Sequence, residues 1–294
     1  MKKYLALALS LLLLAGCTGK DTQVASVTTL PETTEATEAT ISETTVPETT
    51  EAPTETEAPS ETVDAQVVAT ADPVITEAQN TVYVSTADEF LKAIAPNTDI
   101  VVDAELIDFS TATGYGKTNG DYYRWDDPFD GPELILCNLT NVTVRGSGQE
   151  RTDVTLSAVP RYADVLTFEN SANIYVTNIT LGHTKEPGSC IGGVLNFVNS
   201  QDVLVENCDL YGCGTVGVGG ENSLNMQVYN CLIHDCSVGG LSLTNCQNVR
   251  VDCTTFRNLG DKEFPEYEAS IFRMWDCENV TMDGAEAVPF QPFH

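Results

Sequence analysis

"NSQDVLV" (residues 199–205) is one of six copies of a heptad that opens with Asn or Asp, has a second Asn or Asp at its fourth position and ends apolar–variable–apolar. The other copies are NLTNVTV (138–144), NSANIYV (170–176), NSLNMQV (222–228), NCQNVRV (245–251) and DCENVTM (276–282). Apolar residues that alternate with variable ones are typical of a half-buried strand, and Asn and Asp favour turns. Each copy therefore predicts a polar turn followed by a strand.

Apolar residues also precede and follow each heptad in register. Two residues before the opening Asn or Asp, the six copies have Leu136, Phe168, Phe197, Gly220, Leu243 and Met274. Four residues before it, they have Leu134, Leu166, Leu195, Val218, Leu241 and Phe272. A third short strand follows in TNITL (177–181), NCDLY (207–211), NCLIH (230–234) and CTTF (253–256). Three strands in as few as 23 residues, with no helical stretch between them, predict a solenoid whose asparagines stack from coil to coil.

The repeat resembles the right-handed parallel β-helix proteins of the pectin-lyase-like superfamily over about residues 81–294. The resemblance implies an all-β fold, a right-handed parallel β-helix of about seven coils with an N-terminal capping helix. A pectin-cleaving hydrolase of that superfamily would carry paired aspartates between coils and a Gly-His-Gly element, which GHT (182–184) half matches. A calcium-dependent lyase would carry outward carboxylates on consecutive coils. Here Glu169 and Glu221 share an outward column, but Val198 separates them.

A cover for the first coil is expected in residues 82–103. This stretch predicts a strand and then a helix that Thr86 opens, with Glu89 three residues later as in a capping box. Phe90, Leu91 and Ile94 form the apolar face that would lie over the coil.

The N-terminal region predicts export rather than a folded domain. Residues 1–16 have two lysines followed by a short apolar run, as in a signal peptide, and Leu14–Cys17 resembles the lipobox of bacterial lipoproteins. The resemblance implies a lipid on Cys17 that holds the chain on the outer face of a bacterial membrane; the alternative is an ordinary signal peptide with a chance cysteine. Residues 17–80 are rich in Thr, Glu, Ala and Pro and predict a disordered stalk before the 81–294 domain.

The net charge of −29 excludes one class of partner. Residues 81–294 contain 30 acidic and 11 basic side chains, whereas nucleic-acid binding needs clustered Lys and Arg. We expect no nucleic-acid partner, membrane contact through the lipid alone, and a monomer.

Four cysteines form two spaced pairs, Cys208 with Cys213 and Cys231 with Cys236. In the heptad register these thiols fall into columns along the coil axis, which favours buried thiols because free cysteine behaves as a small hydrophobe. Disulfides remain open because an exported protein permits them, and zinc remains a third alternative although it needs four converging ligands.

Insertions after the third strand are expected to form a wall along one corner, where solenoids often carry function; they are residues 146–164, 182–193 and 259–269, with the longer 111–132 before them. Residues of that flank are candidates for acid–base catalysis: His183, His234, Arg161, Asp164 and Glu186. Candidates for ligand binding are Tyr162, Lys185, Tyr211, Arg257, Arg273, Trp275 and Trp125. The alternative is that these are ordinary solvated side chains of loops and strands.

The segment YRWDDPFDG (123–131) adds a possible metal site. Asp126, Asp127 and Asp130 offer the oxygen ligands that calcium prefers, although their spacing is not that of an EF-hand. Asp-Pro and Asp-Gly are equally common in turns, so a plain turn is the alternative. No other cofactor is expected.

Three functions fit these features. The favoured hypothesis is a surface-anchored module that binds, and in some cases processes, polysaccharide or cell-wall glycan. The second is a catalytic polysaccharide lyase or glycosidase, and the third is a non-catalytic adhesin or display protein. Fold resemblance does not choose among them.

Overall fold

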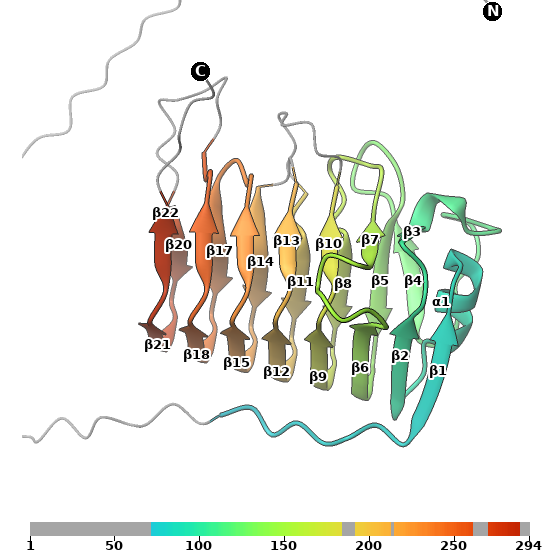
Figure 1. The fold of residues 1–294 in the computed structure, drawn as a ribbon, viewed down its shortest axis with the longest axis horizontal. Coiled ribbons are helices and arrows are strands. Elements are labelled where there is room, and N and C mark those ends of the chain that lie inside the picture. The colour runs from blue at the N-terminus through green and yellow to red at the C-terminus, as the bar shows by residue number, and fades with distance from the viewer. Residues whose placement is uncertain (1–71, 184–191, 213–214, 261–269, 289–294) are drawn as a thin grey trace, which may run out of the picture. The chain divides into compact units, whose positions relative to one another are not determined.

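The computed structural model describes residues 72–183, 192–212, 215–260 and 270–288, all within a compact unit that spans 64–294. These residues form a three-sided coil of short strands with one α-helix, α1 (Ala87–Ala93), and one short 3-10 helix, η1 (Phe109–Thr111). Figure 1 shows the strands stacked side by side along the axis of the coil. No helix within the described ranges is long and apolar enough to cross a membrane.

Each side of the coil is one sheet. Sheet A contains, in spatial order, β1 (Asn80–Val84), β2 (Thr98–Val102), β6 (Thr140–Gly146), β9 (Ala172–Thr177), β12 (Gln201–Glu206), β15 (Leu224–Tyr229), β18 (Gln247–Asp252) and β21 (Glu278–Asp283). Sheet B contains β3 (Leu106–Asp108), β7 (Thr155–Ser157), β10 (Thr180–Gly182), β13 (Asp209–Tyr211), β16 (Leu232–His234), β19 (Thr255–Arg257) and β22 (Glu286–Val288). Sheet C contains β4 (Tyr123–Asp126), β5 (Glu133–Cys137), β8 (Leu166–Glu169), β11 (Leu195–Val198), β14 (Val216–Glu221), β17 (Gly239–Thr244) and β20 (Ser270–Trp275).

The chain runs from sheet C to sheet A to sheet B in every coil, so the predicted β-helix is confirmed. All strand pairs are parallel except β4 with β5, which are antiparallel. The register also confirms the predicted columns, since Phe197 pairs with Phe168 on one side and with Gly220 on the other. Each heptad begins at the turn from sheet C to sheet A and continues into the sheet A strand.

The backbone explains why each heptad opens with Asn or Asp. All six opening residues have a φ between 49° and 56°: Asn138, Asn170, Asn199, Asn222, Asn245 and Asp276. This left-handed region is strained for most residues and is best tolerated by Asn, Asp and Gly. Asn199, Asn222 and Asn245 also donate a side-chain hydrogen bond, 3.1–3.3 Å long, to the asparagine of the preceding coil. The predicted asparagine stack is therefore confirmed for these coils.

The interior of the coil is filled by the apolar columns. Phe168 and Phe197 stack with ring centroids 5.6 Å apart, and both are fully buried. Val203 and Val205 of sheet A and Leu210 of sheet B are fully buried as well. Burial of each such side chain contributes about 1.5–3 kcal/mol, so every added coil extends the core.

The N-terminal end is covered as expected. Thr86 caps α1 by accepting a hydrogen bond from the Glu89 N–H, while Glu89 accepts one from the Ser85 N–H. Phe90 and Leu91 are buried against the first coil. Residues 72–79 precede β1 and run along the coil, where Asp72 forms an ion pair with Arg250 of β18 (Figure 1).

The described cysteines are free thiols. All seven lack a disulfide: Cys137, Cys208, Cys231, Cys236, Cys246, Cys253 and Cys277. Cys208 and Cys231 are buried on adjacent coils, with the Cys208 N–H 3.5 Å from the Cys231 sulfur. Thr254 takes the next position in the same column and accepts from the Cys231 N–H. The preferred interpretation of this column as stacked thiols is confirmed; Cys213 lies outside the described residues.

The expectation that every insertion follows a third strand is wrong for residues 146–164. This segment contains β7, because residues 155–157 pair with both β3 and β10. Residues 147–154 therefore bulge at the corner between sheets A and B, and only 158–165 lie at the corner between sheets B and C. The long segment 112–132 contains β4, which runs antiparallel along β5, so only its turn 127–132, next to the start of β5, lies at the predicted corner.

Candidate functional site

The outer face of sheet C, next to the corner between sheets B and C, carries a set of polar side chains. Successive strand residues point to opposite faces, so two columns of each strand face outward. One column reads Thr167, Asn196, Gly219, Ser242, Arg273, and the other reads Glu169, Val198, Glu221, Thr244, Trp275. The second column confirms that Val198 separates Glu169 from Glu221.

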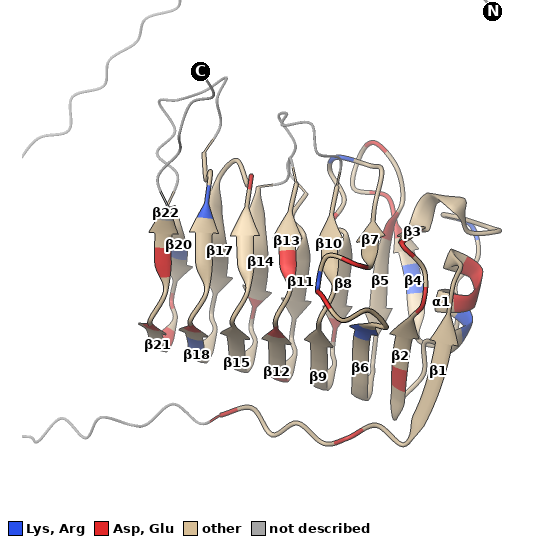
Figure 2. Cartoon of the chain, in the orientation of Figure 1, with Lys and Arg blue, Asp and Glu red and all other residues tan. Residues whose placement is uncertain are grey.

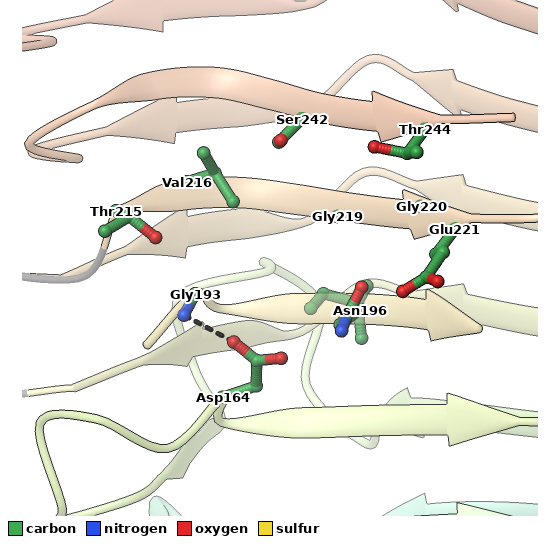
Figure 3. Close-up of a pocket in the computed structure, with 11 residues that line it drawn as sticks. Asp164, Gly193, Asn196, Thr215, Val216, Gly219, Gly220, Glu221, Ser242 and Thr244 are labelled. Carbon is green, nitrogen blue, oxygen red and sulfur yellow. Dashed lines mark hydrogen bonds between the residues drawn. The ribbon is translucent and has the colours of Figure 1, made fainter. Parts of the chain in front are cut away.

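A groove of about 220 Å³ crosses this face over β11, β14 and β17. Its polar lining comes from Asp164, Asn196, Thr215, Glu221, Ser242 and Thr244, which Figure 3 shows on successive coils. Gly219 keeps its centre open, because a Cβ atom there would come within 2.5 Å of the Asn196 amide oxygen. The groove thus offers amide, hydroxyl and carboxylate groups above a flat backbone.

Asp164 belongs to a pair of carboxyl groups at the loop end of the groove. The second member is Glu133 of β5, which accepts a hydrogen bond of 3.0 Å from the Asp164 N–H. The Thr167 hydroxyl lies 3.2 Å from an oxygen of each acid. Asp164 also accepts from the Gly193 N–H, drawn as a dashed line in Figure 3.

The environment of Glu133 favours its protonated form. Burial, and then the negative charge of Asp164, raise its pKa from 4.5 to about 7. A threonine hydroxyl has one hydrogen to donate. With Glu133 protonated, its O–H can donate to Thr167 while Thr167 donates to Asp164. A pKa of about 7 lets Glu133 bind and release its proton near neutral pH, as an acid–base group requires.

Arg124 of β4 neutralises the acidic side chains on the N-terminal side of the groove. Its guanidinium lies 2.5 Å from Glu169, 3.3 Å from Asp126 and 3.0 Å from the Cys137 sulfur. Trp125, the next residue on β4, packs edge-on against Tyr115 with ring centroids 5.0 Å apart.

His183, a predicted catalytic residue, is only 4% exposed. Its Nε2 atom lies 2.9 Å from the Gly193 carbonyl, and Gly212 packs against its ring. Both contacts fix the corner between sheets B and C behind the groove. His183 thus holds Gly193, which donates to Asp164, while its Nδ1 atom is buried without a hydrogen-bond partner among the described residues.

His234, the second predicted catalytic histidine, lies on sheet B in one column with Tyr211 and Arg257, as expected. Its ring stacks on Tyr211 at 5.6 Å and its two nitrogens lie 2.8 Å from Asp209 and 2.5 Å from Asp235. Burial lowers the pKa of His234, but the hydrogen bonds to the two carboxylates outweigh it and raise the pKa. Both nitrogens of the imidazolium are therefore occupied by these two carboxylates.

The other predicted residues are dispersed. Arg161 and Tyr162 lie on the loop before Asp164, where their backbone N–H groups donate to Asp130. Arg273 and Trp275 are exposed on β20, beyond the groove. Lys185 and Glu186 lie outside the described residues.

The three aspartates considered for calcium do not assemble into a ligand set. Asp126 pairs with Arg124, and both oxygens of Asp130 accept backbone N–H groups. Across the part of the chain that the structure describes, no group of three or more His, Cys, Asp or Glu side chains converges as metal ligands. Asp130 instead ties the turn between β4 and β5 to the loop between β7 and β8.

Sequence reasoning identified Asp164 but missed Glu133, Thr167 and Asn196. Each is the polar residue of an alternating strand, and the predicted columns already placed Thr167 next to Asn196. The strand register alone could therefore have identified this face, whereas the Glu133–Asp164 contact joins residues that are 31 positions apart and depends on how the loop before β8 folds.

Three solved structures are similar to this chain at a low level. A candidate glycosyl hydrolase from Parabacteroides merdae has a TM-score of 0.45 and 10% identity, covering 71% of this chain and 98% of its own. The thermostable pectate lyase PL 47 has a TM-score of 0.30 and 12% identity, with 70% and 79% covered. The A-module of the mannuronan C-5 epimerase AlgE4 from Azotobacter vinelandii has a TM-score of 0.21 and 12% identity, with 74% and 78% covered.

No curated protein matches the chain. The family described as "right handed beta helix region" matches residues 137–284, from the end of β5 to the turn after β21. This segment contains the six heptads and the whole groove. The chain therefore belongs to the right-handed β-helix family.

Proposed function

We propose that the β-helix domain binds a polysaccharide or cell-wall glycan across the outer face of sheet C. The groove over β11, β14 and β17 carries this proposal, because it lines up Asn196, Ser242 and Thr244 from three consecutive coils. Amide and hydroxyl groups both donate and accept hydrogen bonds, as sugar hydroxyls require. Because consecutive coils place polar groups at regular intervals, the groove suits a ligand that is itself a chain of repeating sugars.

Glycan cleavage is the second candidate function, and the Glu133–Asp164 pair favours it. The pKa of Glu133 is raised to about 7, and its neighbour Asp164 lines the groove. Protonated Glu133 supplies a proton through Thr167 to Asp164, so that Asp164 acts on the ligand as acid or base.

Binding is tested on a panel of plant, microbial and cell-wall glycans with the full chain, with and without EDTA. Ser242→Trp places a large side chain in the groove without entering the core, because Ser242 faces outward. Thr281→Trp on the exposed face of sheet A is the matched control. We expect Ser242→Trp alone to abolish binding; equal binding by both variants would remove the groove from the proposal.

Cleavage is tested on the glycans that bind. New reducing ends indicate a hydrolase, and an unsaturated product that absorbs ultraviolet light indicates a lyase. Glu133→Gln and Asp164→Asn should remove either activity while binding persists. Binding without any product in the wild type leaves the binding function and rejects catalysis.

We also propose that the chain is exported and held on the outer face of a bacterial membrane by a lipid on Cys17, with a monomeric domain beyond the stalk. Its support is the apolar run that ends at Cys17 and the acidic stalk that follows. Incorporation of labelled palmitate, and its loss in Cys17→Ser, tests the anchor. A Cys17→Ser chain that is labelled as strongly as wild type would refute it.

A further inference from the structure

The central coils of the domain carry almost no positive charge. From 165 to 249 the described residues include no Lys or Arg, although they carry six acidic residues: Glu169, Asp202, Glu206, Asp209, Glu221 and Asp235. In Figure 2 the described ribbon from β8 to β17 has no blue segment. Two cationic groups still reach these coils. The imidazolium of His234 is enclosed by Asp209 and Asp235 on sheet B, and the Arg151 guanidinium donates to the Asn230 carbonyl, away from sheet C. The described residues of these coils therefore carry a net negative charge.

The sheet C groove lies in this stretch, and its ionisable lining is acidic. Asp164 stands at one end and Glu221 at the other, with Asn196 between them (Figure 3). Asp164 accepts from Gly193 and Thr167, which are neutral donors, so its charge is not balanced by a cation. Glu221 is exposed, and its side chain accepts a hydrogen bond of 3.5 Å from the Asn222 amide.

None of the described Lys or Arg side chains, including Arg161 on the loop before Asp164, forms an ion pair with Asp164 or Glu221. Arg124 is occupied by Glu169 and Asp126 on the N-terminal side. Arg273 lies on β20, one strand beyond Ser242, and does not line the groove. A ligand with a carboxylate on each sugar would therefore meet like charge, whereas a ligand with ammonium groups would meet opposite charge.

From this charge distribution we infer that the sheet C groove selects glycans whose sugars carry protonated amines, such as glucosamine polymers, over uronate polymers. An ammonium group has three hydrogens to donate and no acceptor. Glu221, the Asn196 amide oxygen and the Ser242 or Thr244 hydroxyl supply acceptors on adjacent coils, about 4.8 Å apart. The inference rests on the proposed function, since it names the ligand class of the same groove.

The test compares three oligosaccharides of equal length by calorimetry with the full chain: a glucosamine oligomer, an N-acetylglucosamine oligomer and an oligogalacturonate. Measurements at about pH 6 keep the amine protonated. We expect the glucosamine oligomer to bind most tightly and to weaken as sodium chloride is raised, because salt screens exposed charges. Glu221→Gln should weaken its binding about two- to fivefold. Glu278→Gln, the same change on exposed β21 of sheet A, should leave it unchanged.

The outcomes separate the two proposals. Equal binding of the N-acetylated oligomer without salt dependence, or tighter binding of oligogalacturonate with or without calcium, would overturn the preference for amines and leave glycan binding intact. Binding of another glycan from the wider panel in the groove, with no binding of the glucosamine oligomer, would do the same. Failure of every glycan would reject both the preference and the proposed function.

Discussion

The carboxyl group of Glu133 allows the electrostatics of the groove to be measured directly. Its pKa is about 7 in the folded chain, raised by burial and by Asp164, against 4.5 for an ordinary glutamate. An unfolded chain loses this proton near pH 4.5, whereas the folded chain keeps it until about pH 7. The folded state therefore binds more protons in this interval, and the free energy of unfolding falls as the pH rises from about 4.5 to about 7.

Glu133→Gln should remove this pH dependence while it preserves the hydrogen bonds. The amide oxygen can accept from the Asp164 N–H, and the amide nitrogen can donate to Thr167, as the protonated acid does. The two pKa values correspond to at most about 3 kcal/mol, at ~1.36 kcal/mol per pH unit. Because Glu133 is partly exposed, solvent screening reduces this, and we expect the variant to be more stable than wild type by about 1–3 kcal/mol above pH 7.

Urea unfolding of the wild type, Glu133→Gln and the control Glu278→Gln between about pH 4 and about pH 8 measures the difference. Below about pH 4.5 the wild type and Glu133→Gln should agree, because both side chains are then neutral. A stability difference that stays constant from pH 4.5 to 7, or one that favours the wild type above pH 7, would refute the argument that burial and Asp164 hold the proton on Glu133.

Three further predictions concern the coil itself. His234→Gln should lower the free energy of unfolding by roughly 1–3 kcal/mol below about pH 6.5, where the imidazolium donates to Asp209 and Asp235, and the loss should shrink as the pH rises through the raised pKa of His234. A loss that did not depend on pH would contradict this role. Asn199→Ala should destabilise the chain by about 1 kcal/mol more than Asn199→Gly in urea unfolding, because both lose the ladder hydrogen bonds but only alanine is strained at a φ of 49°. Equal losses would rule out that strain. Cys231→Thr should change the stability by less than about 1 kcal/mol, because a threonine already fills this position on the next coil; a larger loss would show that the thiol itself is needed.

The sequence was sufficient for the fold because each coil repeats the same local requirements. The left-handed turn favours Asn or Asp at every corner from sheet C to sheet A, and the alternating strands that flank it fix which side chains enter the core. Register then follows from the heptads, so the neighbours of Phe197 and the column of Tyr211, His234 and Arg257 were predicted correctly. The capping helix at Thr86 is equally local.

The site could not be derived in the same way, because it depends on contacts between coils. His183 looked available for catalysis but is buried behind Gly193, and His234 is held by Asp209, which is 25 residues away. Glu133 acquires its unusual pKa from Asp164, which a loop brings to it across 31 residues. Composition and spacing thus determined the coil and its columns by themselves. The tertiary structure alone decided which outward side chains are buried, paired or open to a ligand, since burial and charge pairing depend on how loops of unequal length fold back between coils.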